Sequence, residues 1–367
     1  MHDPRVEKLA QVLVNYSVGV KPGDKVMIQS GAIAAPLVKA ILAEVLKAGG
    51  HPLSVIQIPG LNDVVFRHAS DEQLKHIPEP MKLALETYDA SISLMSSVNT
   101  KAMSNVPPEK MVVRSQAQQE IFQTVMQRSA AGEFRWVGAL FPTDAYAQDA
   151  EMSLSDYEDF VYAACLPDFD DPVGYWKGVA ERQQKLVDWL AGKNDLRVEG
   201  PDVDLRMKIT GRSFVNCCGE RNMPDGEIFT GPVEDSVEGH VRFSYPTTYQ
   251  GRKLEGVELW FEQGKVVKAT ADKGEDFLLK TIDTDEGARF VGEFAIGTNK
   301  GITKATGNTL FDEKINGSFH MALGAGMPET GSVNKSSIHW DIVCDLSRGG
   351  KIWVDDALFY ENGEFVV

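Results

Sequence analysis

Hydrophobic and polar positions in the first half of the chain alternate between the periods typical of strands and helices. Short apolar runs bounded by charged or turn residues predict buried strands, and apolar residues three and four positions apart predict helices. The predicted strands are 24–30, 52–58, 90–95 and 136–141, and the predicted helices are 35–48 and 109–130. Because strands that alternate with helices pair in parallel through right-handed crossovers, this pattern predicts an open, mostly parallel α/β sheet.

After Gly192 the pattern changes to short alternating segments separated by turn residues, which is typical of antiparallel strands. The predicted strands there are 203–209, 239–245, 258–267 and 351–355, with one helix at 274–282. Two further helices, one around Tyr162 and one from Trp176 to Leu190, lead out of the first half. A chain of 367 residues is long for one core. We therefore expect an α/β domain at residues 1–192 and a mostly antiparallel, β-rich (α+β) domain at residues 193–367.

The charge and composition exclude several classes of protein. The net charge of −16 and the pI of about 4.9 argue against nucleic acid or an anionic membrane as the main partner. The N-terminal residues are charged and lack the apolar region of a signal peptide, and the most apolar run, 33–46, is too short to span a bilayer. The four cysteines form neither a C-x-x-C pair nor a disulfide framework, and Cys217-Cys218 is more typical of half-buried strand residues than of a soft-metal site. We expect a reduced, cytoplasmic protein.

Two of the seven histidines lie in the most motif-like segment of the chain. His339 begins the sequence His-Trp-Asp, which ends at Asp341, and His320 precedes it by nineteen residues. On a strand, residues i and i+2 point to the same face, so the imidazole and the carboxylate would converge. That arrangement suits a divalent metal. An H-x-D sequence also occurs by chance, with the aspartate orienting a core histidine, and the pair alone favours that plainer interpretation.

Two glutamates lie beside residues that allow a close approach of the backbone. Glu227 follows a Pro-Asp-Gly turn, and Glu293 follows Gly292. One such glutamate is more often a solvated surface residue than a ligand. Two glutamates, two histidines and one aspartate together favour a metal site.

The order of these motifs resembles that of the aminopeptidase T/aminopeptidase S family of co-catalytic metallopeptidases, and the resemblance covers nearly the whole chain. It is carried by the start of the chain (3–10 and 20–26) and by Pro224-Asp-Gly-Glu227-Ile-Phe-Thr, Gly292-Glu293-Phe-Ala-Ile-Gly, His320-Met-Ala-Leu-Gly and Ile338-His339-Trp-Asp341. Four motifs in the same order are far more specific than H-x-D alone. The resemblance implies that Glu227, Glu293, His320, His339 and Asp341 bind two metal ions, with Glu293 as the bridging carboxylate.

Such a ligand set suits hydrolysis. Two divalent ions about 3.5–4 Å apart share a water, lower its pKa and hold the attacking and leaving atoms. Carboxylates can bridge two ions, and imidazoles favour zinc or cobalt, with manganese or magnesium as further options. The resemblance also implies a general base near the first histidine. Glu313 is our candidate, although the two patterns differ slightly in length there and Glu313 could equally be a helix or surface residue.

Met327 is the main departure from the family pattern. Many relatives carry a tyrosine seven residues after the first histidine, where this chain reads Gly324-Ala-Gly-Met327-Pro-Glu-Thr330. A phenol there could donate a hydrogen bond to the tetrahedral oxyanion, whereas a thioether cannot. The segment between the two histidines is also shorter than in relatives. We therefore expect either a slower or altered enzyme, or another donor in its place.

We predict a cytoplasmic metalloaminopeptidase that removes N-terminal residues from short peptides and, by the resemblance, forms a homodimer. The first alternative is a mononuclear Fe(II) ring-cleaving dioxygenase that uses His320, His339 and Asp341 as its iron triad. Glu227 and Glu293 argue against it, because one iron ion would not need them. The second alternative is a non-catalytic binding homologue, and only Met327 favours it.

Overall fold

The computed structural model describes residues 3–367, which form two compact units. The first unit runs to Tyr175 and includes Gly219–Met223, and the second contains Trp176–Cys218 and Pro224–Val367. The units differ from the predicted division at residue 192 because helix α9 (Pro172–Leu190) begins in the first unit and continues in the second. The assignment of 1–192 and 193–367 as separate domains stays a prediction. Among residues 3–367, every helix is too short or too polar to cross a bilayer.

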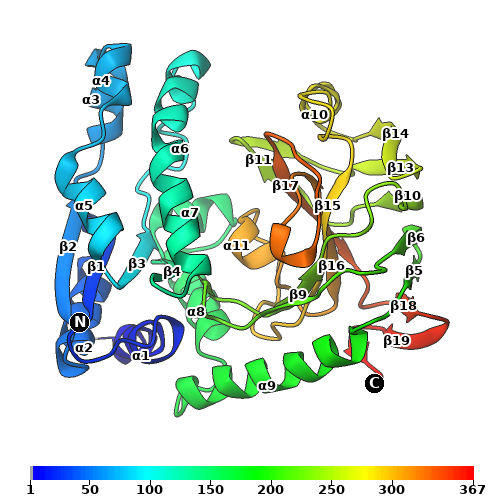
Figure 1. Ribbon diagram of the computed structural model, residues 1–367, viewed down its shortest axis with the longest axis horizontal. Coiled ribbons are helices and arrows are strands. Elements are labelled where there is room, and N and C mark those ends of the chain that lie inside the picture. Colours follow the sequence, from blue (N-terminus) through cyan, green and yellow to red (C-terminus); the bar gives the residue numbers. More distant parts are fainter. Residues whose placement is uncertain (1–2) are drawn as a thin grey trace. The chain divides into compact units, whose positions relative to one another are not determined.

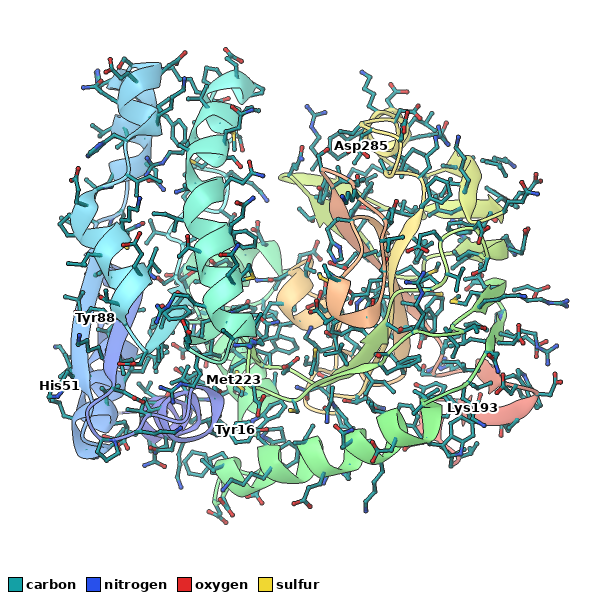
Figure 2. All side chains as sticks on the ribbon, in the orientation of Figure 1. Tyr16, His51, Tyr88, Lys193, Met223 and Asp285 are labelled. Atoms are coloured by element: carbon teal, nitrogen blue, oxygen red, sulfur yellow. The ribbon has the colours of Figure 1, made fainter. Side chains whose placement is uncertain are left out.

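The first unit is built on a five-stranded sheet in which every pair of neighbours is parallel. The strand order is β2 (His51–Gln57), β1 (Lys25–Gly31), β3 (Ala90–Met95), β4 (Arg135–Leu140) and β8 (Asn222–Met223). The four longer strands match the predicted ones, and the parallel α/β sheet is confirmed (Figure 1). β2 is an edge strand, and His51 at its start is exposed (Figure 2).

The helices of the first unit include both of those predicted from periodicity, α2 (Ala35–Lys47) and α6 (Pro108–Ala130). The others are α1 (Pro4–Val12), which continues into a π-helical turn at Leu13–Ser17, α3 (Leu61–His68), α4 (Asp71–Lys75), α5 (Glu79–Thr87), α7 (Asp144–Asp149) and α8 (Leu154–Cys165). The pattern missed α3 to α5 because they are short and bury little; α3 has no buried residue. α8 and α9 are the two helices expected around Tyr162 and Trp176.

The second unit contains two antiparallel sheets and a small hairpin (Figure 1). The eight-stranded sheet has the order β14 (Lys265–Thr270), β13 (Glu258–Glu262), β10 (Glu238–Arg242), β6 (Val203–Lys208), β5 (Asp195–Gly200), β18 (Lys351–Val354), β19 (Ala357–Glu361) and β20 (Glu364–Phe365). The five-stranded sheet has the order β17 (His339–Asp345), β16 (Ser318–Gly324), β15 (Val291–Gly297), β9 (Glu227–Thr230) and β7 (Val215–Cys217). The hairpin is β11 (Thr247–Tyr249) with β12 (Arg252–Leu254), and the helices are the continuation of α9, α10 (Glu275–Ile282) and α11 (Thr309–Asp312).

One predicted strand of this unit is wrong in detail. The segment 258–267 is a hairpin rather than a single strand, because the chain turns between β13 and β14. Gln263 and Gly264, at the turn, have φ values of 49° and 76°. Two consecutive positive φ values are typical of the two-residue turns whose twist matches antiparallel strands. The mostly antiparallel character predicted for this region is confirmed.

The five-stranded sheet has one apolar face and one polar face. Alternate residues of β15, β16 and β17 are buried in a core that they share with the eight-stranded sheet. They are Phe294, Ile296, Phe319, Met321, Leu323, Trp340, Ile342 and Cys344. Because side chains alternate along a strand, the residues between them must point to the opposite face. That face carries the candidate site.

Candidate metal centre

The five predicted ligands lie on one face of the five-stranded sheet. Glu227 lies on β9, Glu293 on β15, His320 on β16, and His339 and Asp341 on β17. Residues directly opposite each other on neighbouring strands share a face. Each ligand has a small neighbour across the strands: Ala322 next to Glu293 and Asp341, Ala295 next to His320, Gly297 opposite Glu227, and Gly324 opposite His339. These small residues leave room for the larger ligating side chains to converge.

A β-bulge at Gly292 sets the direction of Glu293. Val291 pairs with Leu323, but Glu293 pairs with Ala322, so Gly292 is the extra residue. The bulge lets Val291 point into the core while Glu293 points to the other face, which is how bulges often re-aim a side chain beside a site. A Cβ at position 292 would lie 2.2 Å from the Ala325 carbonyl oxygen. Only glycine fits there, which explains the Gly-Glu sequence of this motif.

Glu293 lies between the two histidines. Its Oε1 is 3.3 Å from Nε2 of His320, and its Oε2 is 3.5 Å from Nε2 of His339. Oδ1 of Asp341 is 3.5 Å from Nε2 of His339 and 3.9 Å from Nε2 of His320. The same-face geometry expected for His339 and Asp341 is therefore present. A carboxylate with one oxygen toward each imidazole is suitably placed to bridge two ions.

Two carboxylate oxygens of the cluster are suited to bind a cation. Glu227 Oε2 and Asp341 Oδ1 are buried, and neither has a hydrogen-bond partner among residues 3–367. Burying an oxygen anion without a partner is costly, so such atoms are normally paired or coordinated. Ligating atoms of Glu227, Glu293 and His320 lie within 4.8 Å of one another, as do those of Glu313, His320 and Asp341. The donor set of carboxylates and imidazoles suits divalent transition metals.

Backbone carbonyls orient both imidazoles. Nδ1 of His320 is 3.1 Å from the Glu313 carbonyl oxygen, and Nδ1 of His339 is 2.8 Å from that of Ala325. When Nδ1 donates to a carbonyl, Nε2 is left as the ligand atom, and this is the usual outer support of metal-binding histidines. Both Nε2 atoms face the carboxylates.

Without an ion, the carboxylates favour the protonated imidazoles. Burial opposes charge on His320, but the hydrogen bond to Glu293 and the nearby carboxylates outweigh it and raise the pKa of His320 to about 9. Burial likewise opposes charge on His339, and the Asp341 carboxylate raises its pKa to about 10. An entering cation would displace these protons, so metal binding should release protons.

A loop anchored by Asp285 leads into β17. Asp285 follows α10 (Figure 2) and accepts hydrogen bonds from the Ser336 hydroxyl and from the N–H and hydroxyl of Ser337, each at 2.7 Å. Asn334 donates to the Gly324 carbonyl at 2.6 Å. These contacts hold the residues just before His339, and therefore its ring.

Glu313 and Met327 lie on the segments that support the two imidazoles. Glu313 is the C-cap of α11, and its carbonyl accepts from His320. Burial raises the pKa of its side chain to about 8, against the opposing effect of Lys314. Met327 begins the 3-10 turn Pro328–Thr330, two residues after Ala325, and its carbonyl accepts from the Thr330 hydroxyl at 2.7 Å.

Sequence reasoning missed the polar groups behind Glu227. Lys314 donates to Glu227 at 2.8 Å, and Asp225 Oδ1 lies 3.8 Å from the same ammonium group. Ligating atoms of Cys217, Asp225 and Glu227 also lie within 4.8 Å of one another. Gln183 on α9 donates to the Glu227 carbonyl at 3.0 Å and so fixes β9. The only available signal was adjacency, because Asp225 and Lys314 are close neighbours of Glu227 and Glu313 in the chain.

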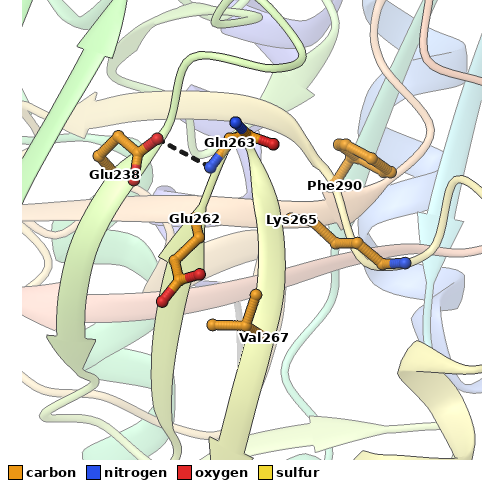
Figure 3. Close-up of a pocket in the computed structure, with 6 residues that line it drawn as sticks. All are labelled: Glu238, Glu262, Gln263, Lys265, Val267 and Phe290. Carbon is orange, nitrogen blue, oxygen red and sulfur yellow. Dashed lines mark hydrogen bonds between the residues drawn. The ribbon is translucent and has the colours of Figure 1, made fainter.

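A surface hollow elsewhere in the unit does not involve these residues. It lies on the β13–β14 hairpin and is lined by Glu238, Glu262, Gln263, Lys265, Val267 and Phe290 (Figure 3). Glu238 accepts a hydrogen bond from the Gln263 N–H at 2.8 Å. None of these lining residues belongs to the cluster of carboxylates and imidazoles. The cluster is therefore the better candidate for the functional site.

Comparison with known proteins identifies the family and the fold that this chain resembles. A model of the peptidase family M29, described as thermophilic metalloprotease, matches residues 2–365. The chain is 27% identical to aminopeptidase 2 of Geobacillus stearothermophilus, over 98% of this chain and 91% of the relative. It is 27% identical to aminopeptidase T of Thermus thermophilus, over 88% and 85%. The fold is similar to that of wild-type AmpT from Thermus thermophilus, with a TM-score of 0.86, 24% identity and 99% of each chain covered.

Proposed function

Because the chain belongs to the M29 family of thermophilic metalloproteases, we propose that it is a metal-dependent aminopeptidase acting on short peptides. Relatives that it matches over most of their length carry the name aminopeptidase. The observation that carries the proposal is the convergence of three carboxylates and two imidazoles on one face of a sheet. Two of the carboxylate oxygens are buried without a hydrogen-bond partner in the part of the chain that the structure describes.

Glu227, Glu293, His320, His339 and Asp341 are the residues that would hold two divalent ions, of which zinc or cobalt fits the imidazoles best. Bound there, the ions would polarise the scissile carbonyl and lower the pKa of the attacking water. Glu293 would bridge, because its two oxygens face different imidazoles. The backbone carbonyls behind both Nδ1 atoms keep the imidazoles in the ligating tautomer.

Glu313 is our candidate for the group that takes the proton from the attacking water. Its carboxylate is one of three groups, with His320 and Asp341, whose ligating atoms lie within 4.8 Å of one another. A general base must lie within hydrogen-bond reach of the proton it removes, and the nearness of Glu313 to His320 and Asp341 supports this role. It would then pass the proton to the leaving amine.

The iron oxygenase alternative is less well supported by the geometry. It needs only His320, His339 and Asp341. The Glu293 carboxylate lies less than 4 Å from Nε2 of His320 and from Nε2 of His339. Oε2 of Glu227 lies 3.8 Å from Nε2 of His320. A single iron ion would leave these carboxylates without a role. We further propose a cytoplasmic homodimer, in keeping with the family resemblance.

The test is cleavage of short peptides followed by mass spectrometry. The protein is loaded with cobalt or zinc and given each peptide in an unblocked and an N-acetylated form, with a chelator control. We expect the loss of one N-terminal residue from the unblocked peptides alone, and none after chelation. Cleavage of the acetylated peptides would contradict an aminopeptidase, and no cleavage with either metal would contradict the hydrolytic function.

A further inference from the structure

Lys314 is a buried lysine beside the proposed ligands that the hydrolytic scheme does not use. It follows Glu313 in the segment between α11 and β16, and its side chain is 1% exposed. Its backbone N–H donates to the Phe311 carbonyl, and its own carbonyl accepts from the Asn299 N–H, both at 3.0 Å. These two hydrogen bonds fix the Lys314 backbone, and they therefore fix the position from which its side chain extends into the cluster.

Three carboxylates surround the ammonium group of Lys314. It donates to Oε1 of Glu227 at 2.8 Å and to Oε1 of Glu313, and Oδ1 of Asp225 lies 3.8 Å away. A buried ammonium ion is tolerated only when it is paired and hydrogen-bonded. Lys314 satisfies this condition entirely with residues of the candidate site and its immediate surroundings.

The two oxygens of Glu227 have different environments. Oε1 accepts from Lys314, whereas Oε2 is buried without a hydrogen-bond partner among the described residues and lies 3.8 Å from Nε2 of His320. The hydrogen bond from the ammonium group occupies one lone pair of Oε1 and draws charge from it, so Oε2 is the better oxygen to bind an ion. Lys314 therefore determines which oxygen of Glu227 faces His320.

We propose that Lys314 is a positioning residue of the metal centre, which ties Glu227 to Glu313 so that Oε2 of Glu227 faces the ion. This inference rests on the proposed function only in placing an ion beside Glu227. The ammonium group also helps to balance charge. Five carboxyl groups belong to the cluster, namely Asp225, Glu227, Glu293, Glu313 and Asp341, and one ammonium with two divalent ions would supply five positive charges.

A charge-neutral double variant separates positioning from charge balance. Lys314→Met combined with Asp225→Asn removes one positive and one negative charge, and Asp225→Asn alone is the matched control that keeps the lysine. Cobalt(II) is titrated into each metal-free protein, and the dissociation constant and the visible absorption spectrum at saturation are measured. Losing an outer partner of a ligand typically weakens metal binding about 10- to 100-fold. We expect the dissociation constant of the double variant to exceed that of the Asp225→Asn control by this factor, and its spectrum to differ from that of the control.

The opposite result is equally clear. A double variant with the dissociation constant and spectrum of the control, and only a lower melting temperature without metal, would make Lys314 a structural charge partner and overturn the proposal. If the double variant does not fold, Lys314→Arg keeps the charge but changes the donor geometry. We expect it to alter the cobalt spectrum and to lower kcat more than it changes KM, and a spectrum identical to that of the parent would overturn the proposal.

The same titration separates this proposal from the proposed function. A parent protein that binds cobalt in a lysine-dependent way but cleaves no peptide would refute the aminopeptidase and leave the role of Lys314 intact. A parent protein that takes up no cobalt would overturn both.

Discussion

Gly297 offers a sharp test of how the second unit positions its chemistry. This residue lies on β15 opposite Glu227, and a Cβ there would lie 2.2 Å from the Ile315 carbonyl oxygen and 2.8 Å from the Lys314 carbonyl carbon. Carbon atoms prefer separations of about 3.5–4 Å from their neighbours, so Gly297→Ala must displace the Lys314–Ile315 backbone by more than about 1 Å. That backbone carries Lys314 and directly follows Glu313.

Two magnitudes follow from this displacement. Overpacking a well-packed site typically costs about 1–3 kcal/mol. At about 2–4 °C per kcal/mol for a unit of this size, the melting temperature should fall by about 2–12 °C. A shift of about 1 Å in catalytic groups can cost about a hundredfold in rate. We therefore expect a peptidase activity reduced by about two orders of magnitude in a protein that still folds.

Gly138→Ala is the matched control, because Gly138 also lies within a strand. There the nearest atom to an added Cβ is the Asn222 Oδ1 at 3.8 Å, an ordinary contact. Thermal unfolding and peptide cleavage are measured for the parent and both variants. If Gly297→Ala melts and cleaves as the Gly138→Ala control does, the segment yields without moving the site, and the reasoning is refuted.

Three further predictions concern other residues. Glu293→Gln should lower metal content and abolish hydrolysis, because an amide cannot bridge two cations as a carboxylate does; an active, fully metallated variant in elemental analysis would contradict the bridge. Met327→Tyr should raise kcat by up to about a hundredfold by restoring an oxyanion donor, and an unchanged kcat with the metals bound would count against a missing phenol. Burial is the largest single effect on Asp285 and raises its pKa, but the hydrogen bonds from Ser337, Ser336 and Gly287 together outweigh it and lower the pKa to about 2. Its contribution to stability is therefore complete above about pH 4 and is lost as the pH falls toward 2. The difference in urea midpoint between the parent and Asp285→Asn should shrink from pH 5 to pH 2.5, and a constant difference would refute this.

Local pattern was sufficient for much of the fold. The alternation of strand and helix periods before residue 192 predicted the parallel sheet, and period-two alternation after it predicted antiparallel strands. It failed where local signals are weak or mixed. The helices α3 to α5 bury little, and the hairpin turn at Gln263–Gly264 interrupts what looks like one apolar run.

The sequence alone also determined which residue types could form the candidate site. Glycines, alternating core residues and an H-x-D spacing are local properties, and they place His339 and Asp341 on one face wherever β17 lies. The convergence of Glu227 with Asp341, far apart in the chain, was decided by the order β17-β16-β15-β9, because neighbouring strands bring distant residues into register. The role inferred for Lys314 depends on the tertiary structure most of all. A lysine in a short loop is normally solvated, and only the packing of the α11–β16 segment against β15 buries its ammonium group among carboxylates.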